Sequence, residues 1–166
     1  MIVTDKYVFF YGSIFSQWVE VDIVEGDNTF NTAEQYMMYH KAVLMGDHDI
    51  AQQIMDNDDP AKQKALGRKI KNWDQALWDA NKYNIVLQGN ILKFSQNMEA
   101  LKTLLKFGRN RNFVEASPTD TIWGIGMGER DAGIEDPTNW RGQNLLGKVL
   151  DETYQKLRSY KPSKAV

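Results

Sequence analysis

An apolar stripe that also carries charge is the most informative pattern in the chain. Counted from Glu34, positions three or four residues apart are occupied by Met37, Met38, Lys41 and Met45. This spacing predicts a helix that turns one face toward a protein core. Because such a face rarely carries charge, the presence of Glu34 and Lys41 on it needs a reason.

Alternating positions and turn residues predict short strands near both ends of the chain. Strands are expected in KYVFFYG, at Val19, Val21 and Ile23 before an EGDN turn, and in NFVEASP and TIWGIG. Helices are expected to begin at Asn31 or Thr32, at Asp59 and Pro60, at about Asp74, in NMEALKTLLKFG and after Asn144. The pattern predicts an α+β fold, a helix-rich single domain over residues 1–166 with a small, mostly antiparallel sheet.

Two glycines add expectations about packing and helix ends. Gly89 lies on the apolar stripe of the helix expected from about Asp74 to Phe94, where a missing side chain allows close packing. Gly108 is expected just after the last turn of its helix, where glycine is common.

Composition excludes several classes of site. The 166 residues contain no cysteine and carry a net charge of −2, so neither disulfides nor a general affinity for nucleic acid is expected. His40 and His48 are the only histidines, which argues against a histidine-rich metal centre. No apolar run approaches the roughly 20 residues of a membrane span, and MIVTDKYVFF lacks the features of a signal peptide. A cytoplasmic location is therefore expected.

Glu34 and Lys41 have separate structural explanations and one joint functional explanation. Glu34 follows Asn31 by three residues and could cap the helix. Lys41 could bury its aliphatic stem and keep its ammonium in water. Alternatively, the pair faces a shared pocket, where burial lowers a lysine pKa and frees a neutral amine for nucleophilic attack.

Glycine and turn residues concentrate in EASPTDTIWGIGMG. A dinucleotide-binding fingerprint fails here, because Glu129 stands where a third glycine is required after Gly124 and Gly126. The better interpretation is a strand in which glycines leave the backbone uncovered by side chains, so that a ligand or another strand can approach it closely.

The same segment carries further polar and aromatic candidates. Asp120 and Glu115 supply carboxylates, and Trp123 offers either a flat face for a base or sugar or an ordinary core side chain. Basic residues also cluster: Lys64, Arg68 and Lys71 are expected on one helix face, and Lys102, Lys106, Arg109 and Arg111 follow later. Such clusters are either solvated faces or sites for the phosphates of a nucleotide.

A family resemblance runs through these motifs from about residue 9 to residue 157. The segments FYGSIFSQW, TAEQYMMYHKA, KALGRKIKNW, KFSQN, FVEASPTDTIWGIG and WRGQNLLGKVL match, in order, motifs of the NADAR (YbiA-like) family. Ile14 stands where that family usually has proline. Tyr154 stands where it commonly has an arginine, so any role of that arginine in holding a phosphate is in doubt here.

The resemblance implies a YbiA-like fold and an N-glycosidase that cleaves the bond between a ribose and a base or exocyclic amine. The expected partners are a small-molecule nucleotide, such as a phosphoribosylamino intermediate of riboflavin synthesis, or ADP-ribosylated guanine, including guanine in DNA. No metal, cofactor or membrane is expected. A module that binds ADP-ribose or a nucleotide without turnover is the alternative, as is a partner protein that uses the same fold.

Residue roles follow from the matching motifs. The resemblance implies catalytic roles for Glu34 (acid/base), Lys41 (Schiff base) and Asp120, and substrate-binding roles for Ser16, Gln17, Tyr36, Met37, Arg68, Glu115, Trp123, Gly124, Gly126 and Asn144.

Overall fold

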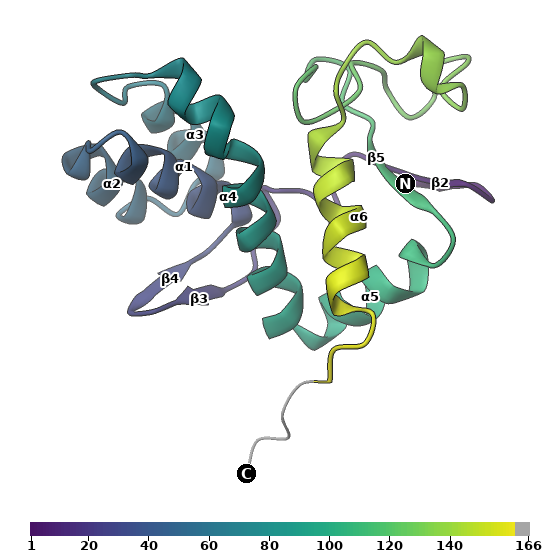
Figure 1. Ribbon diagram of the computed structural model, residues 1–166, viewed down its shortest axis with the longest axis horizontal. Helices are drawn as coiled ribbons and strands as arrows, with labels where there is room; N and C mark the ends of the chain where they lie inside the picture. Colours follow the sequence, from purple (N-terminus) through teal and green to yellow (C-terminus); the bar gives the residue numbers. More distant parts are fainter. Residues whose placement is uncertain (162–166) are drawn as a thin grey trace. The chain divides into compact units, whose positions relative to one another are not determined.

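The computed structural model describes residues 1–161 and divides into two compact units, which Figure 1 lets the reader follow by colour along the chain. Unit 2 is the continuous segment Gln17–Gln96. Unit 1 combines Met1–Ser16 with the chain from Asn97 onward. The polypeptide therefore leaves unit 1 after Ser16, builds unit 2, and returns at Asn97.

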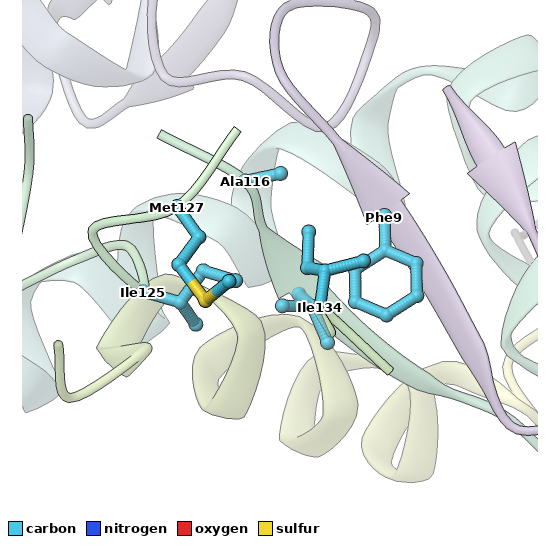
Figure 2. Close-up of a cluster of buried hydrophobic side chains, with 6 residues drawn as sticks. Phe9, Ala116, Ile125, Met127 and Ile134 are labelled. Carbon is cyan, nitrogen blue, oxygen red and sulfur yellow. The ribbon is translucent and has the colours of Figure 1, made fainter. Parts of the chain in front are cut away.

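Unit 1 is built on a three-stranded sheet with the order β1-β2-β5. β1 (Ile2–Val3) pairs antiparallel with β2 (Tyr7–Phe10), and β2 pairs parallel with β5 (Asn112–Glu115). The helices of this unit are α5 (Met98–Gly108), the short 3-10 helix η1 (Pro137–Asn139) and α6 (Leu145–Leu157). Apolar side chains from β2, β5 and the loop after β5 form one core cluster: Phe9, Val114, Ala116, Ile125, Met127 and Ile134 (Figure 2).

Side chains from α6 and the residue before it close the outer edge of β5. Asp151 accepts a hydrogen bond from the Phe113 N–H (2.8 Å) through Oδ1. Asn144 accepts from the Glu115 N–H (3.0 Å) and donates to the Phe113 carbonyl (3.0 Å). The strand edge therefore has partners, although within residues 1–161 no further strand lies beside it.

Unit 2 surrounds α1 (Ala33–Leu44) with three other helices and a hairpin. α1 packs against α2 (His48–Met55), α3 (Pro60–Gly67) and α4 (Gln75–Gln96), and the hairpin joins β3 (Ile23–Glu25) to β4 (Asn28–Phe30). Gly67 and Gly89 permit this packing, since an added Cβ would strike the side chains of Met38 and Tyr36 respectively. The expectation of close packing at Gly89 is confirmed.

The α+β fold class is confirmed, and two of the three strand pairings are antiparallel. The hairpin turn at EGDN and the helix starts at Asp59 and Asn144 also match expectation. Whether residues 1–166 act as one domain stays a prediction.

Several local predictions are wrong. TIWGIG is a loop, and the segment that contains Val19 and Val21 is not a strand. The sequence interpretation also missed α2. Gly108 is the last helical residue and not a residue beyond the helix, and its close neighbours are Tyr154 and Phe113.

Candidate active site

Glu34 and Lys41 lie on α1, in unit 2. Glu34 is 4% exposed, and its N–H donates to the Gln17 carbonyl (2.9 Å). Two turns later, Lys41 is half-buried, and its Nζ lies 4.8 Å from the centroid of the Trp73 ring and 5.3 Å from that of Trp78. The amine is therefore held beside two indole rings on an otherwise apolar helix face.

The surroundings of Lys41 lower the pKa of its amine. Burial is the main cause that lowers the Lys41 pKa below the ordinary lysine value, and the positive charges of Arg68 and Lys64 lower it further. The negative charge of Glu34 acts in the opposite direction, by stabilising the ammonium. The amine is thus more readily available as a nucleophile than that of a solvated lysine.

The structural explanation of Glu34 as a helix cap is wrong. Thr32 is the capping residue, and its Oγ1 accepts from the Gln35 N–H (2.9 Å). Gln35 reaches back to accept from the Asn31 N–H (2.7 Å). This reciprocal pair resembles a capping box, with Gln35 in the role that the sequence suggested for Glu34.

Basic residues flank Lys41 on the α3 side. Arg68 caps the C-terminus of α3, and both Arg68 and Lys64 are exposed. The Nζ of Lys64 lies 5.9 Å from the ring of Trp18, which is 44% exposed. The expected shared helix face is wrong for Lys71, because α3 ends at Gly67. Exposed cations and an indole face suit a phosphorylated, base-containing ligand.

Tyr36 and Met37 serve the interior of unit 2. The Tyr36 hydroxyl donates to Glu25 Oε2 (2.6 Å), and Glu25 Oε1 also contacts His40 Nε2 (2.7 Å). Burial, and then the Glu25 hydrogen bond and charge, raise the pKa of Tyr36. Met37 is 6% exposed. The predicted substrate contacts of these two residues stay predictions.

In unit 1, Asp120 organises the loop that follows β5. Its Oδ1 accepts from the backbone N–H groups of Ile122 (2.9 Å) and Trp123 (2.8 Å), and its own N–H donates to Ser117 Oγ (3.1 Å). Oδ1 therefore stabilises the SPTD turn, and the predicted catalytic role of Asp120 would use Oδ2.

The glycines of WGIG are needed for this loop. A Cβ on Gly124 would meet the carbonyl oxygens of Asp120 (2.9 Å) and Glu115 (3.0 Å). Gly126 has a φ of +69°, which disfavours other residues. The close backbone approach that the sequence indicated is thus confirmed for Gly124, although the approaching backbone belongs to the loop itself and to the end of β5.

The remaining unit 1 candidates have different environments. Trp123 and Glu115 are half-buried, and Trp123 lies outside the core cluster of Figure 2. Asn144 occupies the N-cap position of α6 with a φ of 53°, but its side chain bonds the edge of β5 and makes no cap hydrogen bond. The Ser16 N–H donates to the Ser13 carbonyl (3.0 Å), where the chain leaves unit 1.

Tyr154, the departure from the family pattern, packs its ring where Gly108 leaves space, and a Cβ at Gly108 would come within 2.6 Å of it. The ring thus joins α6 to the end of α5.

Lys93, on α4, is a buried amine that the sequence interpretation missed. It is fully buried, and desolvation lowers its pKa from 10.5 to about 7. A signal was present, because Lys93 follows Val86 and Asn90 on one helix face, all of them buried. A fully enclosed amine cannot meet a substrate without rearrangement, so Lys41 is the better candidate for a nucleophile.

Residues 1–161 contain no group of three or more His, Cys, Asp or Glu side chains suited to a metal ion. Over the same residues, no helix has both the length and the apolar character needed to cross a membrane.

Comparison with known proteins connects both units to one family. A sequence model of the NADAR domain matches residues 9–158. The chain is 47% identical over 160 residues to N-glycosidase R617 of Acanthamoeba polyphaga mimivirus, a match that covers 89% of this chain and 94% of that protein. It is 31% identical over 133 residues to N-glycosidase Npun_R5314 of Nostoc punctiforme, covering 80% and 78% of the two chains.

Two further proteins are similar to this chain, one in sequence and one in fold. Protein irg-1 of Caenorhabditis elegans is 45% identical over 130 residues, which cover 77% of this chain and 61% of irg-1. The NMR structure of the E. coli protein YbiA aligns with a TM-score of 0.75 and 22% identity over 99% of this chain and 94% of YbiA, which shows the shared fold. Since the domain match spans most of both units and the mimivirus relative aligns over nearly its whole length, the chain belongs to the NADAR domain family.

Proposed function

We propose that the protein is an N-glycosidase that hydrolyses the bond between carbon 1 of a ribose and a nitrogen. The observation that carries this proposal is the pairing of Glu34 with a desolvated Lys41 on one face of α1. The names of the mimivirus and Nostoc relatives support the same reaction class.

Lys41 acts as the nucleophile in this proposal. The ribosylamine ring first opens: the bond from carbon 1 to the ring oxygen breaks, the ring oxygen gains a proton, and the substrate nitrogen loses its proton and forms an imine with carbon 1. The neutral Nζ of Lys41 then adds to carbon 1, the electron pair of the C=N π bond moves to the substrate nitrogen, and one Nζ proton is passed to that nitrogen. Glu34 delivers a proton to the departing nitrogen, which leaves with the electrons of the broken C–N bond. Loss of the Nζ proton leaves a Schiff base between Lys41 and the sugar. Water then adds to this imine, Glu34 moves the protons, and the free sugar departs while the amine is restored.

The substrate is a phosphorylated ribose joined to a base or exocyclic amine. Exposed Lys64 and Arg68 beside Lys41 supply cations for phosphate oxygens, and the Trp18 ring beside Lys64 offers a stacking face. ADP-ribose on guanine, free or in DNA, and a phosphoribosylamino intermediate of riboflavin synthesis both satisfy this description.

The test is incubation of the protein with an ADP-ribosylated guanine nucleotide and, separately, with a ribosylaminopyrimidine phosphate. Mass spectrometry should detect one free base or amine for each free sugar. Lys41→Ala provides the inactive control. Tight binding of either compound without release of sugar would contradict the glycosidase and support a binding module.

A further inference from the structure

The amine of Lys41 lies in a corner formed by two indole rings, those of Trp73 and Trp78. Its Nζ is 4.8 Å from the Trp73 centroid and 5.3 Å from the Trp78 centroid. The two centroids are 6.3 Å apart and the ring planes are inclined by 51°, so the rings meet at an angle and do not stack. By comparison, the Nζ of Lys106 approaches the single ring of its neighbour Phe107 (5.4 Å). Two π systems therefore converge on the nitrogen of Lys41, and we call this arrangement the aromatic corner.

The two walls of the aromatic corner differ in their exposure. Trp78, on α4, is 7% exposed, whereas Trp73, just before α4, is 41% exposed. The Trp73 Nε1–H donates to Gln75 Oε1 (3.1 Å), and Gln75 Nε2 donates to Asp79 Oδ1 (2.9 Å). Because a carboxylate only accepts hydrogen bonds, Gln75 must turn its oxygen toward Trp73. The ring that borders solvent is thus anchored at its N–H, and its π system stays beside Lys41.

An ammonium is poorly accommodated in the aromatic corner. Among residues 1–161, none accepts a hydrogen bond from Lys41 Nζ, although an ammonium has three N–H donors and is strongly hydrated in water. Desolvation is accordingly the main cause that lowers the Lys41 pKa, and the attraction of Glu34 does not offset it. The rings attract a cation, but they do not replace the hydrogen bonds that the ammonium loses.

A protonated Schiff base at the same atom suits the aromatic corner better. In this iminium, Nζ has a single N–H, and the positive charge is shared with carbon 1 of the sugar. The iminium therefore loses less hydration than the ammonium, while the attraction between its charge and the two rings remains. Aromatic rings bind weakly hydrated cations in the same way when they recognise quaternary ammonium groups.

We propose that Trp73 and Trp78 stabilise the iminium that forms on Lys41 when the leaving nitrogen departs from carbon 1. This inference rests on the proposed function for the reaction in which the iminium forms. In that step, the bond from carbon 1 to the leaving nitrogen breaks and its electron pair goes to that nitrogen. The lone pair of Nζ forms the new C=N π bond at the same time. The positive charge thus develops on an atom that lies 4.8 Å from the Trp73 centroid.

Two labelling reactions of the whole protein distinguish the iminium from the neutral amine. Ribose 5-phosphate with cyanoborohydride measures the iminium, because this reagent reduces iminium ions much faster than neutral imines. Acetic anhydride measures the neutral amine and forms no iminium. Peptide mapping by mass spectrometry gives the rate of each reaction at Lys41, and the quantity compared is the ratio of sugar trapping to acetylation.

Trp73→Leu keeps an apolar side chain beside Lys41 but removes the π system. The ratio should fall about 2–30-fold, as expected for one cation–π contact, and acetylation should stay the same or rise. Trp73→Phe retains a smaller π system and should give an intermediate ratio. Tyr160→Leu is the matched control, since the Tyr160 ring is also 41% exposed and belongs to unit 1, and it should leave the ratio unchanged. If Trp73 merely packs against Lys41, trapping and acetylation change together and the ratio stays constant.

Fluorotryptophan provides a second test that does not depend on the folding of a variant. Its incorporation in place of tryptophan weakens the negative π face and nearly preserves the shape of the ring, so the ratio at Lys41 should fall. The fall should be smaller in Trp73→Leu, where Trp78 alone remains beside Nζ. Thermal melts verify that each protein is folded, and the fluorinated wild type decides the matter if Trp73→Leu does not fold.

The outcomes separate this inference from the proposed function. An unchanged ratio in folded Trp73→Leu or in the fluorinated wild type, or a wild type in which the sugar is never trapped on Lys41, overturns the inference. A ratio that falls as expected in a protein that releases no base from a ribosylamine overturns the glycosidase and leaves the aromatic corner in place. Release of base with an unchanged ratio does the reverse.

Discussion

Glu34 combines deep burial with a charge that acts on Lys41, and it leaves the capping of α1 to Thr32 and Gln35. A carboxylate in that position is expensive to desolvate, and proton transfer is the reason that we propose for its burial. The sequence alone located this residue, because a charge on an apolar stripe is visible in the spacing. It could not distinguish a cap from a proton donor, since that depends on which side chain reaches the Asn31 N–H.

Glu34→Gln should therefore fold normally and lose most of its turnover. A glutamine keeps the shape of the side chain but cannot exchange a proton, and general acid–base groups typically contribute about 10²–10⁴-fold. Turnover per folded molecule and the melting temperature should be measured together. Gln35→Ala, which damages the cap, is the control and should lower the melting temperature instead. Full activity in Glu34→Gln would remove the residue from the reaction.

Lys41 should form a covalent adduct that can be trapped. Borohydride added during turnover of a ribosylamine substrate should reduce the Schiff base and fix the sugar on Lys41, as peptide mapping would show. Because burial lowers the Lys41 pKa, the rate of adduct formation should rise with pH and level off below the ordinary lysine value of 10.5. Labelling of Lys93 in place of Lys41 would contradict the assignment.

Lys41→Arg separates the covalent role from an electrostatic one. Arginine keeps the charge and much of the bulk but cannot form the imine, so this variant should be as inactive as Lys41→Ala. Near-normal turnover in Lys41→Arg would show that the charge alone matters.

At the scale of elements, periodicity predicted the long helices well and the connections poorly. α4 and α6 bury a stripe against their neighbours, and the stripe is visible in the sequence, whereas α1 is buried on all sides along residues 33–38. TIWGIG alternates like a strand, but its backbone groups bond within the loop and to the segment before α6, for instance Gly126 N–H to the Asp120 carbonyl (3.2 Å). The alternation of apolar and polar residues does not reveal which backbone groups these N–H groups bond. α2 was missed because it is only eight residues long.

The Asp120 turn gives a prediction at this scale. Asp120→Asn retains an Oδ1 that can accept from the Ile122 and Trp123 N–H groups, so it should fold normally. It should still weaken turnover, because an amide lacks the negative charge on which the predicted catalytic role of Asp120 depends. Asp120→Ala loses both bonds, and it should lose about 1–3 kcal/mol of unfolding free energy and more than tenfold in turnover, as the loop loosens. Asp136→Ala is the matched control, since Asp136 Oδ1 holds the Thr138 N–H (2.9 Å) in another turn of unit 1. Unchanged turnover in Asp120→Asn would show that the charge of Asp120 takes no part in the reaction and would move the site away from this turn.

At the scale of the whole molecule, Lys93 couples stability to pH. Its pKa is about 7 in the folded protein against 10.5 for an ordinary lysine, so the unfolded chain binds the extra proton between these values. Stability should therefore rise with pH across the window from about 7 to 10.5, and the cost of burying the amine should be complete below about pH 7. That cost is on the order of a few kcal/mol.

Lys93→Met should remove this slope and raise the unfolding free energy at neutral pH, because a methionine of similar length needs no proton. Denaturant melts at several pH values between 6 and 10 measure the effect. Lys102→Met, at an exposed site on α5, should leave the slope unchanged. A Lys93→Met protein that is less stable at neutral pH, with the slope intact, would show that the ammonium stabilises the fold.

The parallel pairing of β2 with β5 determines when each part of the molecule can fold during synthesis. Tyr7 of β2 pairs with Asn112 of β5, about a hundred residues later, whereas unit 2 is continuous between Gln17 and Gln96. On the ribosome, unit 2 can close its own contacts as soon as Gln96 emerges. The apolar residues of β2 must wait for β5 and α6, with Phe9 and Phe10 exposed throughout. Pulse proteolysis of arrested nascent chains should therefore find protection within residues 17–96 first. The interval between the emergence of unit 2 and that of α6 is the time in which a nascent chain is most open to chaperones and to aggregation.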